Sequence, residues 1–198
     1  MIEYDSTGGS WITALDERDF SDDNFQKILS FFLIHTPVIS LSAQAKDLHS
    51  HGWSSPWNKK YYLNKQLKEA SSNYNLIFST KKYDVMSDAI TKADLRTNFL
   101  TDLQTERIAI HISNKDQSQF ISVFNHIRNS IAHARFVIRK AEIEDQYKRV
   151  YVFQDGKLEK NGFKISARMV LREETLLKWI NIISGGEVEY NKIETNTA

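Results

Sequence analysis

The sequence predicts a mainly α protein with one small antiparallel β-hairpin inserted before the last helix. Three observations support this fold class. The 198 residues include only two prolines and seven glycines, which favours helices over an all-β fold. Apolar residues recur at helical spacing over most of the chain between residues 21 and 136. Alternation of apolar and polar residues, typical of a half-buried strand, is clear only from Phe163 to Leu171.

The first half of the chain is expected to be helical after a flexible lead-in. Residues 1–20 have little periodicity and should be loosely attached. Ser21 to Asn24 form a plausible N-cap and acidic first turn, and the segment from His49 to Trp57 is a loop. Helices are expected over about 21–36, 38–48, 58–78 and 83–112.

The second half adds the hairpin and the last helix to a single domain that spans residues 21–183. Asp116 or Ser118 should cap a helix that runs through residues 120–136. The hairpin, at about 147–171, pairs residues 147–153 with residues 163–171 across a loop at Asp155-Gly156. The last helix covers residues 173–183, and Ser184-Gly185-Gly186 begins a polar tail, 184–198.

Composition excludes several classes of protein. The 26 Lys and Arg nearly balance the 25 Asp and Glu, so any basic surface for nucleic acid must be local. No apolar run approaches 18 residues and the N-terminus lacks a signal-peptide profile, so no membrane association is expected. The absence of cysteine excludes disulfides and thiolate metal sites, and it fits a cytoplasmic protein.

The helix predicted around residues 120–136 has two chemically different sides. At 100° per residue, one narrow stripe is apolar and should face the core. Nearly opposite lies a polar set with two imidazoles, and two arginines share a flank between them. The apolar stripe comprises Phe120, Phe124, Ile127, Ile131 and Ile138; the polar set comprises Ser122, His126, Asn129 and His133; the flank holds Arg128 and Arg135.

The six residues from Arg128 to His133 resemble the Arg-Asn-x-x-x-His signature of the HEPN superfamily. The segments 167–171 and 176–180 also resemble the end of such chains, and the resemblance spans roughly residues 75–183. It implies a HEPN-like up-and-down helical bundle. It also implies a metal-independent endoribonuclease of toxin or antiphage (abortive-infection) type that needs no cofactor.

RNA cleavage without a metal requires proton transfer and cations near the phosphorus. Histidine suits the proton transfers because its unperturbed pKa is about 6.5, and arginine binds phosphate oxygens with a planar fork. The expected catalytic residues are therefore Arg128, Asn129 and His133. His126, Arg135 and Ser130 are expected to help bind substrate; for His126 and Arg135, a solvated surface position is an equally good interpretation.

Arg128 and His133 lie about 140° apart on an ideal helix, so they do not converge within one copy. Either the helix loosens near His133, or a twofold partner brings a second motif against the first. HEPN ribonucleases resemble the second case, so a homodimer is expected. An antitoxin or a defence-system protein is a possible further partner. Some HEPN toxins carry a modified Tyr two residues after the motif His; Arg135 occupies that position here, so such control is not expected.

Two alternatives remain open at this stage. The chain could be a non-catalytic module that binds nucleotide or RNA through the same face, or a protein-interaction module whose polar stripe is a dimer seam. Elsewhere, His49 and His51 beside Trp53 and Trp57 suggest a metal site or a stacking platform. A third ligand is missing, so no metal is expected, and these aromatic residues should attach the loop to the core.

Overall fold

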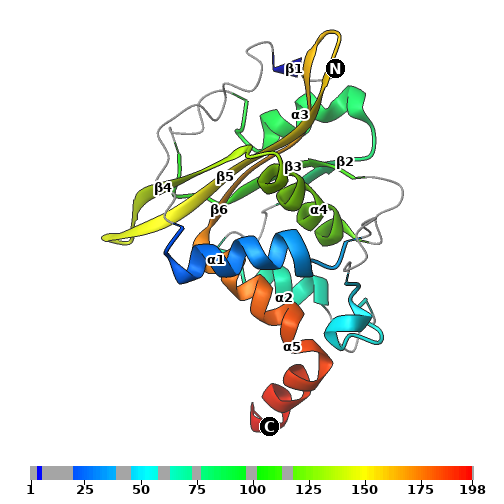
Figure 1. Ribbon diagram of the computed structural model, residues 1–198, viewed down its shortest axis with the longest axis vertical. Coiled ribbons are helices and arrows are strands. Elements are labelled where there is room, and N and C mark those ends of the chain that lie inside the picture. Colours follow the sequence, from blue (N-terminus) through cyan, green and yellow to red (C-terminus); the bar gives the residue numbers. More distant parts are fainter. Residues whose placement is uncertain are drawn as a thin grey trace.

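The computed structural model describes residues 4–5, 20–38, 46–57, 63–72, 77–96, 102–112 and 118–197, with 4–5 and 188–197 described by their backbone alone. Its centre is a mixed β-sheet in the strand order β2-β3-β6-β5-β4, with the short β1 also paired to β6 (Figure 1). The predicted helical bundle is therefore wrong, and the protein has an α/β fold. The strands are β1 (Tyr4–Asp5), β2 (Ile77–Thr80), β3 (Arg107–His111), β4 (Phe136–Ile143), β5 (Gln146–Glu159) and β6 (Gly162–Arg172).

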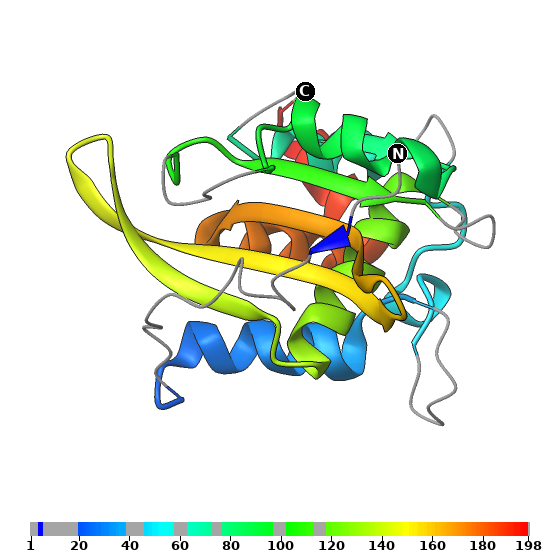
Figure 2. The same cartoon turned by 90° about the horizontal axis from the view of Figure 1, so that it is seen from above.

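Helices cover both faces of this sheet. The helices are α1 (Asp23–Ser30), α2 (Leu63–Glu69), α3 (Met86–Lys92), α4 (Gln119–Ala132) and α5 (Glu173–Thr197). A π-helical turn, Phe31–His35, continues α1, and 3-10 turns lie at His49–His51 and Tyr83–Val85. The larger apolar core joins α1, α2, α4 and α5 to one sheet face, and a smaller core places α3 on the other (Figures 1 and 2).

The hairpin prediction identified a real feature but underestimated its size. β5 and β6 are antiparallel partners, with Tyr151 opposite Leu171 and Phe153 opposite Met169. Both strands are longer than predicted, and β4 adds a third antiparallel strand beside β5. β6 is buried on both faces over most of its length, not half-buried, because a helical layer covers each side.

One segment predicted to be helical, Arg107–His111, is the strand β3, and β2 overlaps the end of the helix predicted at 58–78. β2 and β3 pair in parallel, and β3 joins the sheet through antiparallel pairing with β6. Residues 107–110 of β3 are all buried, so the strand lacks the alternation that would reveal it in the sequence. A short apolar run without alternation looks the same in a helix and in a buried strand, and the sheet decided the outcome.

Helix boundaries agree with the sequence where a capping side chain is present. Asp22 caps α1 by accepting a hydrogen bond from the backbone N–H of Phe25 at 2.7 Å. Ser118 caps α4 through Ile121 N–H at 3.2 Å, as predicted. However, α4 ends at Ala132, and Phe136 and Ile138 belong to β4 instead of the predicted continuous helix.

Some predictions fall largely on residues outside the described ranges. Among them are most of the lead-in at 1–20 and of the helix predicted at 38–48. At the other end, α5 runs to Thr197, but Gly186 interrupts it with non-helical backbone angles where the polar tail was predicted to begin. Within the described residues, every helix is too short or too polar to cross a membrane.

Candidate active site

The apolar and polar sides of α4 lie in different environments, as predicted. Phe120, Phe124, Ile127 and Ile131 are all at least nine-tenths buried. The rings of Phe120 and Phe124 pack against Trp179 of α5, with centroid distances of 5.5 and 5.7 Å. This apolar contact fixes the rotation of α4 on the sheet and turns its polar side toward β3, β5 and β6.

A cavity of about 490 Å³ lies along that polar side. It is lined by residues from five parts of the chain: α4, the carboxyl end of β3, the turn after β2, and the adjacent strands β5 and β6. Because β2 and β3 are parallel, their carboxyl ends lie together, and this brings Tyr83 beside His111. The described lining residues are Tyr83, His111, Asn125, His126, Asn129, His133, Asp155, Gly156, Lys157, Lys164 and Ser166.

His126 and Asp155 form a buried pair at the base of the cavity. His126 Nδ1 lies 2.7 Å from Asp155 Oδ2, and His126 Nε2 lies 2.7 Å from the backbone oxygen of His111. Asp155 also accepts hydrogen bonds from Asn129 Nδ2 and from the backbone N–H of Gly156. Because a carbonyl oxygen only accepts, His126 Nε2 donates to His111 O, and the imidazole is held between this carbonyl and the Asp155 carboxyl group.

This pairing places His126 in the interior, not on a solvated surface. His126 is 7% and Asp155 6% exposed. Ser130 is fully buried and donates to the backbone oxygen of His126 at 2.8 Å, within α4. His126 still lines the cavity, whereas Ser130, which was expected to contact substrate, is not among the described lining residues.

Asn129 is oriented by the same carboxylate. Its Nδ2 donates to Asp155 Oδ2 at 3.2 Å. The amide oxygen, on the other branch of the side chain, is consequently an acceptor available to a ligand in the cavity. One of the two N–H donors of this amide is therefore committed to Asp155.

His133 lies where α4 stops. The helix ends in a Schellman motif, in which Arg135 N–H bonds Ser130 O at 2.7 Å and Ala134 N–H bonds Ile131 O at 3.0 Å. Ala134 has a φ of 53°, a left-handed conformation that usually favours glycine. His133 is exposed, and its side chain has no hydrogen bond or ion pair with any described residue.

Arg135 contacts the strands β5 and β6 of the sheet. Its Nη1 donates to Gly156 O at 2.8 Å, and its guanidinium carbon lies 4.2 Å from the centre of the Phe163 ring. Gly156 is at an irregularity in the β5-β6 register, not in the predicted loop. A Cβ there would lie 2.2 Å from Lys164 O, so the close approach of the two strands requires glycine.

Arg128 is not among the described residues that line the cavity. It is half-buried and lies on the flank of α4, as helical geometry predicted. The helix does not loosen before His133, because His133 N–H still bonds Asn129 O at 3.0 Å. Within one chain, the structure therefore brings together Asn129, His126 and His133, but not Arg128.

Two lysines that the sequence pattern did not identify as site residues lie beside each other on the cavity wall. Lys157 of β5 and Lys164 of β6 are direct cross-strand partners, and both line the cavity. Like charges in this relation destabilise a sheet. Glu159 offsets them in part, at 3.2 Å from Lys157 and 3.6 Å from Lys164. The alternation in β6 could have revealed Lys164 and Ser166 on one face, but not the strand opposite.

The sequence pattern also did not identify Tyr83, whose ring contacts two residues that line the cavity. Its ring stacks on His111 with centroids 3.6 Å apart, and Lys164 Nζ lies 4.1 Å from the centre of the same ring. Burial raises the pKa of the Tyr83 hydroxyl, and the charge of Asp155 adds to this shift. The tyrosine therefore remains neutral and restrains the neighbouring imidazole and ammonium groups.

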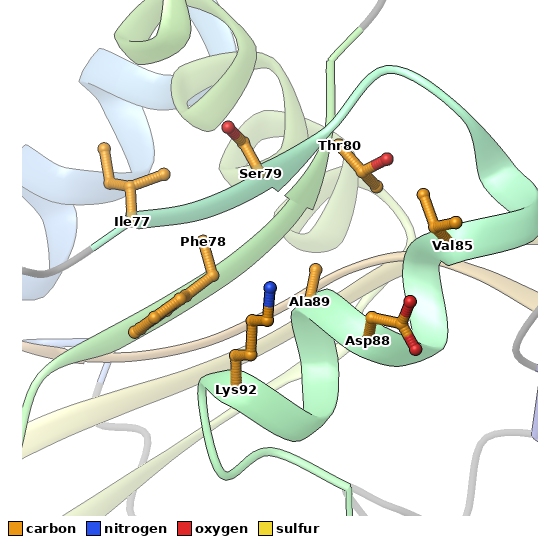
Figure 3. A pocket seen from close by; sticks show the side chains of 8 residues that line it. All are labelled: Ile77, Phe78, Ser79, Thr80, Val85, Asp88, Ala89 and Lys92. Carbon is orange, nitrogen blue, oxygen red and sulfur yellow. The ribbon is translucent and has the colours of Figure 1, made fainter.

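Another cavity, of about 450 Å³, lies between β2 and α3 (Figure 3). Among its described lining residues, only Asp88 and Lys92 carry charge, and they are one helical turn apart on α3. It contains no imidazole from the described residues and does not match the chemistry predicted for the α4 motif.

The loop with His49 and His51 is attached to the core as predicted. Trp53 is 1% exposed and its Nε1 donates to Ile183 O at 2.9 Å, while Trp57 packs against the larger core. In the part of the chain that the structure describes, no three His, Cys, Asp or Glu side chains gather as metal ligands would.

Comparisons with models of protein families, with curated proteins and with solved structures find no match to this chain. Function must therefore be inferred from the chemistry of the α4 cavity.

Proposed function

We propose that this protein is a metal-independent endoribonuclease and that the α4 cavity is its active site. One observation carries the proposal. Lys157 and Lys164 are placed directly opposite each other, at a cost to the sheet, on the wall of a cavity that also contains an exposed histidine. These two ammonium groups, offset in part by Glu159, suit an anionic substrate, and His133 adds an imidazole, the side chain most often used for proton transfer in enzymes.

In the proposed reaction, the 2′-oxygen of the RNA attacks the adjacent phosphorus and the bond to the 5′-oxygen breaks. A base accepts the proton of the 2′-hydroxyl, and an acid donates a proton to the leaving 5′-oxygen. The products are a 2′,3′-cyclic phosphate and a 5′-hydroxyl end. No redox agent or second substrate is needed.

Each lining group has a part in this scheme. His133 is exposed, so it can exchange protons with substrate and water, and His111 is the second imidazole for the complementary transfer. The ammonium groups of Lys157 and Lys164 offset the extra negative charge on the pentacoordinate phosphorus. The oxygen of Asn129 is suited to accept a hydrogen bond from the attacking 2′-hydroxyl.

The proposal no longer depends on a helical bundle, because α4 packs on a sheet. It retains a homodimer as the route by which Arg128 could take part. Arg128 lies outside the cavity of its own chain, so only a second copy could present this guanidinium to a bound phosphate. Sedimentation of the wild type and of Arg128→Ala tests this part: a dimer that loses activity but not association supports the role.

The chemistry is tested by incubating a mixed RNA pool with the protein, with and without EDTA, and by identifying the product ends. We expect cyclic phosphate and 5′-hydroxyl ends, unchanged by EDTA. His133→Ala should reduce cleavage by at least about 10²-fold, the lower range for a general acid or base. His49→Ala, an exposed histidine outside the cavity, is the matched control and should cleave normally.

Products with 5′-phosphate ends, or full activity in His133→Ala, would contradict the proposal. RNA binding without any cleavage would support the alternative of a non-catalytic RNA-binding module. If the enzyme acts as a toxin, induced expression in bacteria should arrest growth, and His133→Ala should restore it. Growth arrest that persists in this variant would remove the toxin assignment.

A further inference from the structure

A separate cavity of about 480 Å³ lies where α1 ends against the His49–His51 turn and α5. None of its lining residues belongs to the α4 cavity. The described residues that line it are Lys27, Ser30, Phe31, His35, Lys46, Ser50, His51, Ile180 and Ser184. Its volume is within the range of pockets that hold small ligands.

The charged and titratable groups of this lining are all basic. Lys27 and Lys46 are exposed, and His35 and His51 are half-buried. None of the described lining residues carries a carboxylate. The neighbouring carboxylate of Asp47 accepts from the backbone N–H and the hydroxyl of Ser50, at 2.8 and 2.7 Å. Among the described residues, Lys27 donates only to the neutral amide of Asn181, at 2.9 Å. Positive charge on the two lysines therefore has little compensation.

The backbone at this cavity is also unusual. Phe31–His35 is a π-helical turn, a rare conformation that often marks a functional site. The turn ends with His35 O accepting a hydrogen bond from His51 Nε2 at 2.6 Å. Because a carbonyl cannot donate, Nε2 carries the proton and Nδ1 of neutral His51 is unprotonated. The Nδ1 atom of His35 is buried and has no hydrogen-bond partner.

We propose that this cavity binds a phosphate group. Two flexible ammonium groups supply the charge, and the hydroxyls of Ser30 and Ser184 can donate to phosphate oxygens. His51 can add a further donor, because protonation of its Nδ1 atom leaves the Nε2 bond to His35 O in place. The ligand is either inorganic phosphate or a small phosphate monoester. The organic part of a monoester would also occupy the rest of the cavity, whereas inorganic phosphate would not.

Isothermal titration of the full chain at constant ionic strength tests the site, with inorganic phosphate and a nucleoside 5′-monophosphate as probes. We expect saturable binding that Lys46→Gln weakens at least tenfold. Lys178→Gln, which neutralises an exposed lysine of α5 outside the cavity, should bind as the wild type does. Tighter binding of the monophosphate identifies a monoester as the ligand, and equal binding identifies the inorganic anion.

Binding that is not saturable, or that falls equally in Lys46→Gln and Lys178→Gln, would overturn the proposal. Chemical shifts of the histidine ring protons locate the probe: His35 and His51 should move, and His133 should not. Movement of His133 alone would assign the phosphate to the α4 cavity. This test is independent of RNA cleavage, so the two proposals can fail separately.

Discussion

The two basic cavities are built on different principles. In the α4 cavity, each charge beneath the surface is held by a partner: Asp155 by His126, Asn129 and Gly156, and Lys164 by the ring of Tyr83. In the cavity at the end of α1, the lysines are exposed and have no ion pair with a described residue. The first arrangement fixes atoms in place, whereas the second leaves charge for a ligand to neutralise.

Catalysis and anion binding place different requirements on the positions of the lining groups. Proton transfer depends on groups held to within a fraction of an ångström, which stacking on Tyr83 provides for His111, whereas His133 has no hydrogen bond to a described residue. Anion binding depends mainly on net charge and on donors that can adapt to the ligand. The predictions below disturb the fixed cavity first and the adaptable one last.

The largest effect is expected for Asp155→Ala. The substitution leaves the buried imidazole of His126 and the amide of Asn129 without the carboxyl group that they contact, which should lower the free energy of unfolding by about 3 kcal/mol. Urea denaturation measures the loss. His133→Ala, at the exposed end of α4, should change stability by no more than about 0.5 kcal/mol. Equal stability losses in the two variants would show that the cavity base is not held by this pair.

Substitution of Tyr83 tests the stacking beside the cavity. Tyr83→Leu removes the contacts with His111 and Lys164, which should lower the free energy of unfolding by about 1–2 kcal/mol. Tyr83→Phe retains both contacts and should be nearly as stable as the wild type. If the proposed reaction is correct, kcat/KM for RNA should follow the same order. Loss of activity in Tyr83→Phe would instead indicate a role for the hydroxyl.

A smaller effect, of opposite sign, is expected at the end of α4. Ala134→Gly relieves the left-handed backbone at φ 53° but increases the entropy of the unfolded chain. The net result should be a stabilisation of up to about 1 kcal/mol, measured by thermal unfolding. If activity is unchanged, the strained turn serves only to end the helix; if activity falls, the turn also positions His133.

The smallest effect concerns pH at the second cavity. Burial lowers the pKa of His51 below its ordinary value, and Lys46 and His35 lower it further against the opposing effects of the His35 carbonyl and Asp47. The unfolded chain therefore binds a proton more readily, so this residue reduces stability as pH falls through about 6.5. Removing it with His51→Gln should flatten the acid side of the stability profile by no more than about 2 °C in Tm.

Added phosphate provides a further test of the role of His51 at low pH. A bound anion favours protonated His51, so added phosphate should reduce the acid loss in the wild type and have less effect in His51→Gln. An identical response of both proteins to phosphate would place the anion elsewhere.

Some features could be predicted from sequence because they depend on local spacing or on a single side chain. The apolar stripe of α4 follows from helical periodicity, and the caps Asp22 and Ser118 act within three residues of their own position. Alternation identified β6, and the proximity of Asn129 and His133 follows from one turn of helix.

Only the tertiary structure decided the rest. β3 is buried on both sides by two helical layers, so its sequence contains no alternation to distinguish it from a helix. Asp155-Gly156 looks like a turn in sequence, yet the approach of Lys164 O makes it a strand irregularity. The opposition of Lys157 and Lys164, and the pairing of His126 with Asp155, join residues far apart in the chain. Periodicity describes how a segment faces its surroundings, but the partner that occupies those surroundings is chosen by the packing of the whole chain.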